Sequence, residues 1–161
     1  MATERNPGPD WDPGRADQII SGHCGVKGGL IEALHALQAE FGYIDEAAYE
    51  TLAKAFNLSR AEVYGVVSFY HDFRDRPAGH KVVKLCQAEA CQAMGSRKLT
   101  AAVKDFLGVD FGETTCDGAV TLEAVYCLGN CATPPSVMID DRVYGRMTAE
   151  RFSRLVRGRP S

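Results

Sequence analysis

The first half of the chain has the spacing of apolar residues that is typical of amphipathic helices. Apolar side chains recur at intervals of four, three and four, at Leu30, Leu34, Leu37 and Phe41. This spacing places them on one face of a helix. Gly42 follows the run, and glycine is common just past the carboxyl end of a helix. The pattern predicts a bundle of three or four helices over residues 16–76.

Two further helices of the bundle are predicted from their first residues. Asp45 is expected to cap a helix that carries Leu52 and Phe56 on its buried side. The run Ser59-Arg60-Ala61-Glu62 has the form of a capping box and opens the next helix. The glycine-rich stretch 22–29 does not match a phosphate-binding loop, so a linker between helices is predicted there.

The bundle is expected to depend on its surroundings. A bundle of about sixty residues buries too little surface to be stable by itself, so contacts with the second half of the chain or with a partner are expected to stabilise it. Most aromatic side chains of segment 64–70 are expected to fill its core; the alternative is that part of this face docks on a larger subunit. Residues 1–15 carry prolines and glycines around Trp11 and are predicted to form a flexible tail.

The second half of the chain changes to short apolar stretches separated by turn residues, which are typical of strands. The expected elements, in chain order, are a strand at 81–85, a helix from Ser96, a hairpin over 114–126 that turns at Asp117-Gly118, strands at 137–139 and 143–144, and a helix after Thr148. The order is therefore strand, helix, four strands and helix. Together with the bundle, it indicates an α+β protein whose second domain spans residues 80–158.

Composition and charge narrow the class of protein. The 161 residues are 45% hydrophobic and 24% charged, which is typical of soluble globular proteins. A net charge of -3 argues against general nucleic-acid binding, which normally needs a basic surface. No apolar run approaches the roughly 18 residues of a membrane span. The first residues lack the apolar core of a secretory signal, so a cytoplasmic location is expected.

Two cysteine pairs stand out from the rest of the chain. Cys86 and Cys91 are separated by four residues and Cys127 and Cys131 by three, and each pair directly follows an apolar stretch. Two adjacent strand ends would bring four thiolates together, which suits zinc or an iron–sulfur cluster. The chain contains no C-x-x-C, which excludes the dithiol exchange of thioredoxin. The wider gaps favour a cluster, with one pair on each iron, over a zinc ion.

These motifs resemble those of the thioredoxin-like [2Fe-2S] ferredoxin family. The resemblance covers roughly residues 20–157 and rests on the C-x4-C and C-L-G-x-C pairs, with Gly112-Glu113-Thr114-Thr115 and Thr121-Leu122-Glu123 between them. The family includes the small [2Fe-2S] subunit of the NADH-oxidising module of complex I and related subunits of NAD-linked hydrogenases and formate dehydrogenases. The run from Cys86 to Gly95 is most similar to the gamma subunit of soluble NAD-dependent formate dehydrogenase.

The resemblance implies a thioredoxin-like fold for the second domain and one-electron transfer by a [2Fe-2S] cluster. Cys86 and Cys91 would bind one iron, and Cys127 and Cys131 the other. It also implies a flavoprotein partner that binds FMN and NAD(H) and carries a [4Fe-4S] cluster, and, in a formate enzyme, a subunit with a molybdenum cofactor. No catalytic residue is expected in this chain. The alternatives are the equivalent subunit of complex I or a hydrogenase, a free ferredoxin, and a zinc-stapled interaction module.

The sequence also gives expectations for residues outside the two pairs. Cys24 and Cys116 are left over, and Cys116 is predicted to be a turn thiol outside the cluster, with ligand exchange on loss of Cys127 as the alternative. Glu89 is expected to lower the reduction potential, because negative charge near a cluster disfavours reduction. Gly129 is expected to let backbone amides approach inorganic sulfur.

Overall fold

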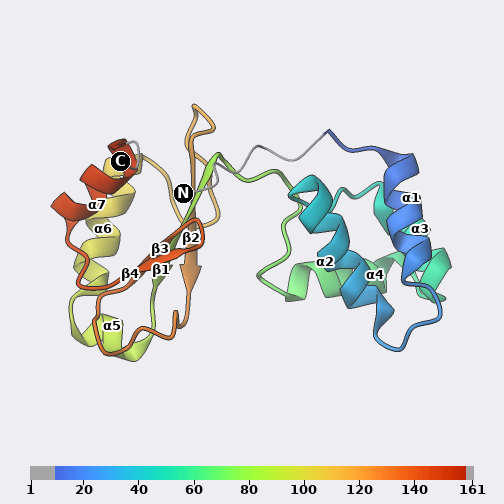
Figure 1. The fold of residues 1–161 in the computed structure, drawn as a ribbon, viewed down its shortest axis with the longest axis horizontal. Coiled ribbons are helices and arrows are strands. Elements are labelled where there is room, and N and C mark those ends of the chain that lie inside the picture. The colour runs from blue at the N-terminus through green and yellow to red at the C-terminus, as the bar shows by residue number, and fades with distance from the viewer. Residues whose placement is uncertain (1–9, 159–161) are drawn as a thin grey trace. The chain divides into compact units, whose positions relative to one another are not determined.

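The structure, a computed structural model, describes residues 10–158, and expectations for residues 1–9 lie outside it. The described residues form two compact units that divide between Ala78 and Gly79 (Figure 1). The first unit is helical and the second combines a sheet with helices, which confirms the α+β class predicted from the sequence. Among residues 10–158, no helix has the length and apolar character needed to cross a membrane.

Within residues 10–78, four helices pack around one apolar core. They are α1 (Pro13–Gly22), α2 (Gly29–Phe41), α3 (Ala48–Phe56) and α4 (Arg60–Phe69). The predicted face of α2 is its buried face: Leu34, Leu37 and Phe41 lie in the core, and Leu30 packs at its edge. Gly42 ends α2 as predicted, with a φ of 82° that glycine adopts without strain.

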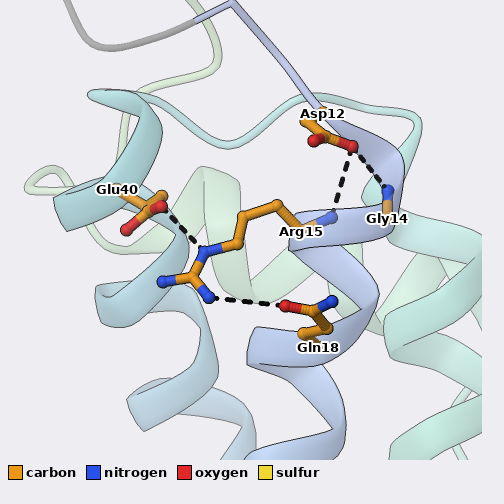
Figure 2. Close-up of polar contacts among 5 residues, drawn as sticks. All are labelled: Asp12, Gly14, Arg15, Gln18 and Glu40. Carbon is orange, nitrogen blue, oxygen red and sulfur yellow. Dashed lines mark hydrogen bonds and ion pairs between the residues drawn. The ribbon is translucent and has the colours of Figure 1, made fainter.

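Helix α1 begins inside the segment for which a flexible tail is predicted. Proline is compatible with the first position of a helix, because the N–H that it lacks would have no partner there. Asp12 Oδ1 accepts hydrogen bonds from the N–H groups of Gly14 at 2.9 Å and Arg15 at 3.3 Å (Figure 2). Pro13 and its neighbours therefore mark a helix start, which the count of prolines and glycines did not reveal.

Two side-chain contacts join α1 and its preceding residues to α2. Arg15 Nε donates to Glu40 Oε1 at 2.8 Å (Figure 2). The ring of Trp11, for which a position in the tail is predicted, is half-buried with its centroid 4.5 Å from that of Phe41. Residues 11–15 are thus part of the helical unit.

Side-chain capping sets the start of α4 and of the turn that precedes α3. The predicted capping box is present: Ser59 Oγ accepts from the Glu62 N–H at 3.2 Å, and Glu62 Oε2 accepts from the Ser59 N–H at 2.8 Å. Asp45 Oδ1 accepts from the Ala47 N–H at 2.8 Å. Asp45 therefore caps the turn that leads into α3, while the helix itself begins slightly later than predicted.

The aromatic side chains at the end of α4 do not fill the core, contrary to the prediction. Tyr64, Phe69 and Tyr70 are 61%, 72% and 49% exposed. The buried positions of α4 are Val63 and Val67, which are four residues apart and so lie on one helix face. This face is filled by the two valines, and the aromatic rings consequently point away from it.

A mixed sheet forms the centre of the described part of the second unit. Its strands β1 (Lys81–Cys86), β2 (Val120–Val125), β3 (Val137–Ile139) and β4 (Arg142–Tyr144) lie in the order β2-β1-β3-β4. β1 and β2 are parallel, whereas β3 is antiparallel to both β1 and β4. The helices of this unit are α5 (Glu89–Ala93), α6 (Ser96–Leu107) and α7 (Ala149–Arg157).

Helices α6 and α7 share an apolar core with the sheet and lie together on one side of it (Figure 1). Leu99 and Val103 of α6 and Phe152 of α7 are buried in one cluster with Val83 and Leu122. Val83 and Leu122 are partners in the β1–β2 register, so they belong to the same face of the sheet. The inner face of α6 therefore packs against the face of the sheet on which Val83 and Leu122 lie.

The predicted hairpin over residues 114–126 is present as a turn, an antiparallel bridge and the flanking hydrogen bonds from Thr115 N–H to the Val120 carbonyl and from Leu122 N–H to the Glu113 carbonyl, but its first half does not form a strand. The Gly118 N–H donates to the Thr115 carbonyl at 2.8 Å, and Thr114 forms the bridge with Thr121. Positive φ angles at Gly112 and Gly118 bend the preceding chain out of an extended path. Residues 79–158 consequently contain four strands, one fewer than predicted.

Candidate metal centre

The two cysteine pairs follow the carboxyl ends of two neighbouring parallel strands. Cys86 is the last residue of β1 and stands opposite Val125, the last residue of β2. The Gln87 N–H donates to the Val125 carbonyl at 2.7 Å, so the pairing continues to the point where both loops begin. Cys127 comes two residues after β2. Because carboxyl ends of parallel strands share one edge of a sheet, the topology brings both loops together there.

The first pair is buried, and its second cysteine lies on a helix. Cys86 and Cys91 are 3% and 2% exposed. The short helix α5, where a loop is predicted, turns the chain back so that Cys91 lies near Cys86 and contributes to the raised pKa of its thiol. Burial is the largest cause of the raised pKa of Cys86, and the nearby backbone N–H groups of Ala88 and Leu128 act in the opposite direction.

The second pair is exposed and closely spaced. The Sγ atoms of Cys127 and Cys131 are 3.7 Å apart. The Gly129 N–H donates to Cys127 Sγ at 3.3 Å and is the main cause of the lowered pKa of Cys127. The hydrogen bond with Cys127 and its negative charge raise the pKa of Cys131. Gly129 has a φ of 72°, a conformation that glycine adopts without strain, as the sequence predicts for a residue that admits a backbone donor.

The two pairs meet at the sheet edge. The backbone N–H of Leu128, between the cysteines of the second loop, lies near Cys86 of the first and acts to lower the pKa of its thiol. The negative charge of Cys86 also contributes to the raised pKa of Cys131, an effect that falls with distance. Within residues 10–158, no three His, Cys, Asp or Glu side chains surround a single ion position. The four sulfurs therefore form two separate pairs and no single group of three or four.

This donor set fits a [2Fe-2S] cluster. Such a cluster takes four thiolates, two on each iron, and its negative charge is stabilised by hydrogen bonds to its sulfurs. The site offers two sulfur pairs, the Gly129 N–H donates to Cys127 Sγ, and the backbone N–H groups of Ala88 and Leu128 lie near Cys86. Soft thiolate donors without an accompanying histidine or carboxylate are also the ligands that iron–sulfur clusters prefer.

A polar link through Asn130 and Ser136, which no sequence motif predicts, supports the second loop. Asn130 Nδ2 donates to Ser136 Oγ at 3.2 Å, and Ser136 is 2% exposed. The Ser136 carbonyl accepts from the Cys86 N–H at 3.2 Å. The link thus fixes the second loop against the strand end that carries the first pair. It could not be found in the sequence, because it depends on how the loop folds back.

The remaining cysteines lie elsewhere. Cys24 is exposed just after α1, and its thiol donates to the Ile20 carbonyl at 3.4 Å. Cys116 is exposed in the turn that precedes β2. It is therefore at the amino end of that strand, roughly 20 Å from the carboxyl edge at the usual rise of a strand. This separation argues against exchange of Cys116 for Cys127. Glu89 is exposed at the start of α5, two residues before Cys91.

Comparison with known proteins gives a family for the chain. Residues 16–159 match the model of the thioredoxin-like [2Fe-2S] ferredoxin family. The match covers both structural units and agrees with the thioredoxin-like fold predicted for the second.

Curated relatives belong to two kinds of oxidoreductase. The NADP-reducing hydrogenase subunit HndA of Solidesulfovibrio fructosivorans is 35% identical over 86% of this chain and 81% of its own. A subunit of the NADH-quinone oxidoreductase of Pseudomonas aeruginosa is 31% identical over 78% of this chain and 76% of its own. Its counterpart in Escherichia coli is 32% identical over the same shares.

Among solved structures, a chain of the NAD+-reducing [NiFe]-hydrogenase in its H2-reduced state has a similar fold. The TM-score is 0.66 at 25% sequence identity, over 80% of this chain. This chain spans only 21% of the length of that hydrogenase chain.

Proposed function

Because the chain belongs to the thioredoxin-like [2Fe-2S] ferredoxin family, we propose that it is the one-electron-transfer subunit of an NAD-linked oxidoreductase. The observation that carries the proposal is the meeting of two cysteine pairs at the carboxyl edge of β1 and β2. Relatives that are subunits of an NADP-reducing hydrogenase and of NADH-quinone oxidoreductases support it.

In this proposal, Cys86 and Cys91 hold one iron, and Cys127 and Cys131 hold the other. The cluster, when bound, takes up and gives away one electron at a time. The two ends of the cluster site differ in exposure, because the first cysteine pair is buried and the second is exposed. Cys127 and Cys131 would therefore hold the cluster at the side that a partner can approach, where the bound cluster would supply electron transfer. The chain positions and shields the cluster and has no assigned role in substrate chemistry.

The proposed assembly is a molybdenum-containing, NAD-dependent formate dehydrogenase, in which this chain is the gamma subunit. The run from Cys86 to Gly95 supports this choice, because its sequence is most similar to that subunit. The proposed partners are a flavoprotein that binds FMN and NAD(H) and carries a [4Fe-4S] cluster, and a catalytic subunit with a molybdenum cofactor. The proposed location is the cytoplasm.

The second candidate is the equivalent subunit of a hydrogenase or of complex I. The names of the curated relatives favour it, since they belong to those two enzyme classes.

Purification of the native complex through a tag on this chain separates these candidates. A formate dehydrogenase should co-purify with flavin and molybdenum and reduce NAD+ with formate. Hydrogen-dependent reduction of NAD+, with nickel or additional iron in place of molybdenum, would assign the chain to a hydrogenase. NADH oxidation coupled to a quinone would assign it to complex I. A chain that co-purifies with no flavoprotein would contradict the subunit proposal.

A further inference from the structure

The amino end of α6 lies beside the first cysteine pair. The buried residues of this helix are Ser96, Leu99 and Val103, whose spacing defines one helix face. Leu99 and Val103 pack in the apolar core that α6 shares with β1. Ser96 therefore lies on the same inward face of α6. The Gln87 side chain, next to Cys86, donates to Thr100 Oγ1 at 3.1 Å. Thr100 lies one turn after Ser96 on α6, so this contact places the amino-terminal half of α6 beside the carboxyl end of β1.

Ser96 has a buried hydroxyl group that lacks a hydrogen-bond partner. The residue is 3% exposed, and within the described residues its Oγ is one of two buried side-chain polar atoms that make no hydrogen bond. An unpaired buried hydroxyl costs about 1–3 kcal/mol. Such a group is therefore uncommon unless another molecule completes its bonding.

The electrostatics of this helix end favour an anion. The residue before α6 is Gly95, which has no capping side chain, and the first turn holds no acidic residue. It carries the basic residues Arg97 and Lys98 instead. The free N–H groups of a first turn give the helix a partial positive charge there, and the two basic residues add to it.

We propose that the Ser96 hydroxyl donates a hydrogen bond to a sulfur of the bound [2Fe-2S] group on the side of Cys86 and Cys91, and raises its reduction potential. This inference rests on the proposed function, because it requires the cluster to be bound by the four cysteines. A cluster with four thiolate ligands is an anion that gains a further negative charge on reduction. A hydrogen-bond donor stabilises the more negative form more strongly, so it favours reduction. Ser96 is a positioning and tuning residue, and it transfers no proton.

Removal of the hydroxyl tests this role in the cluster-loaded full chain. Ser96→Ala should bind iron and sulfide as the wild type does, but its ratio of reduced to oxidised cluster at a fixed potential should fall about tenfold. For a one-electron couple this equals a decrease of about 59 mV in midpoint potential. Ser96→Thr keeps the hydroxyl and should keep the potential. Ser153→Ala is a matched control, because that hydroxyl donates only to the Glu150 carbonyl of its own helix.

A second measurement does not depend on the alanine variant being stable. In reduced wild-type protein, one proton that exchanges in D2O, in addition to those of the backbone N–H groups at the cysteine sulfurs, should couple magnetically to the cluster, and this additional coupling should be retained in Ser96→Thr and lost in Ser96→Ala. An unchanged potential together with an unchanged exchangeable-proton signal in Ser96→Ala would overturn the inference. If the alanine variant does not fold, absence of any such proton in the wild type would overturn it as well. A wild-type chain without iron and sulfide would instead refute the proposed function.

Discussion

The backbone N–H of Leu128 lies near the sulfur of Cys86 and acts to lower the pKa of that thiol, although the two residues belong to different loops. Leu128 lies between the cysteines of the second pair, so this proximity places the two pairs next to each other. The parallel pairing of β1 with β2 makes this possible, because it brings both loops out at the same edge of the sheet. The arrangement of the site is thus a consequence of strand topology.

The ligand assignment predicts a sharp difference between cysteine variants. Cys86→Ser and Cys131→Ser should each lose most of the bound iron and sulfide, because each leaves one iron with a single thiolate. Cys24→Ser and Cys116→Ser are the matched controls and should keep wild-type content, since both residues are exposed, Cys24 belongs to the helical unit, and Cys116 precedes the amino end of β2. Iron and sulfide analysis with visible absorbance of the purified variants provides the measurement. A full complement of cluster in Cys86→Ser would remove that residue from the ligand set.

Gly145 is predicted to be necessary for the position of the second cysteine loop. A Cβ atom at this residue would lie 2.6 Å from the carbonyl oxygen of Thr133, which is two residues after Cys131. Gly145→Ala should therefore displace the loop, lower the free energy of unfolding by about 1–3 kcal/mol, and reduce the iron bound per chain.

The control for this substitution is Gly65→Ala on α4. A Cβ atom there meets nothing within 4 Å, and alanine is the better helix former by about 0.5–1 kcal/mol. Denaturant unfolding and iron analysis of both variants test the prediction. Equal iron content in the two would show that the approach of Gly145 to Thr133 does not matter for the site.

Asp12 is predicted to determine whether α1 forms. Its carboxylate accepts from the N–H groups of Gly14 and Arg15, and loss of an N-cap side chain costs about 1 kcal/mol. Asp12→Ala should lower the free energy of unfolding by this amount, whereas Asp12→Asn, which keeps an acceptor oxygen, should lose much less. Chemical denaturation followed by circular dichroism distinguishes them. Indistinguishable stabilities would mean that Asp12 does not cap the helix in solution.

The capping box predicts a specific pH dependence. Hydrogen bonds from the Ser59 N–H, and then from its hydroxyl, lower the pKa of Glu62. A folded-state pKa below the unfolded value gives stability that is present above the unfolded pKa and is lost as the pH falls through the folded pKa. Ser59→Ala should raise the pKa of Glu62 and reduce the loss of folding stability at low pH. A pH titration of the Glu62 carboxyl by NMR provides the measurement, and an unchanged pKa in the variant would contradict the box.

Local signals in the sequence predicted much of the fold. The Ser59–Glu62 box, the ending of α2 at Gly42 and the start of α6 at Ser96 were all predictable, because each depends on residues close together in the chain. The start of α1 at Pro13 was not predicted, because a high content of proline and glycine does not distinguish a tail from a helix start, where proline suits the first position. The exposure of Tyr64 and Phe69 was not predicted, because composition does not tell which face of a helix is buried.

The candidate site could also be predicted only in part from the sequence. Its four cysteines could be selected from spacing, but the contacts that arrange them could not. The Leu128 N–H reaches Cys86 across two loops, and Ser136 joins Asn130 to the end of β1. Both contacts arise from the packing of one loop against another strand end, and no short motif encodes them.

Determination of iron, acid-labile sulfide and zinc in the purified full chain, with an electron paramagnetic resonance spectrum before and after reduction, tests the central claim most directly. The account predicts iron and sulfide in equal amounts, about two of each per chain, no stoichiometric zinc, and a paramagnetic signal that appears after uptake of one electron. A colourless protein with one zinc ion and no sulfide would contradict it, and would mean that the cysteine pairs form a structural zinc site.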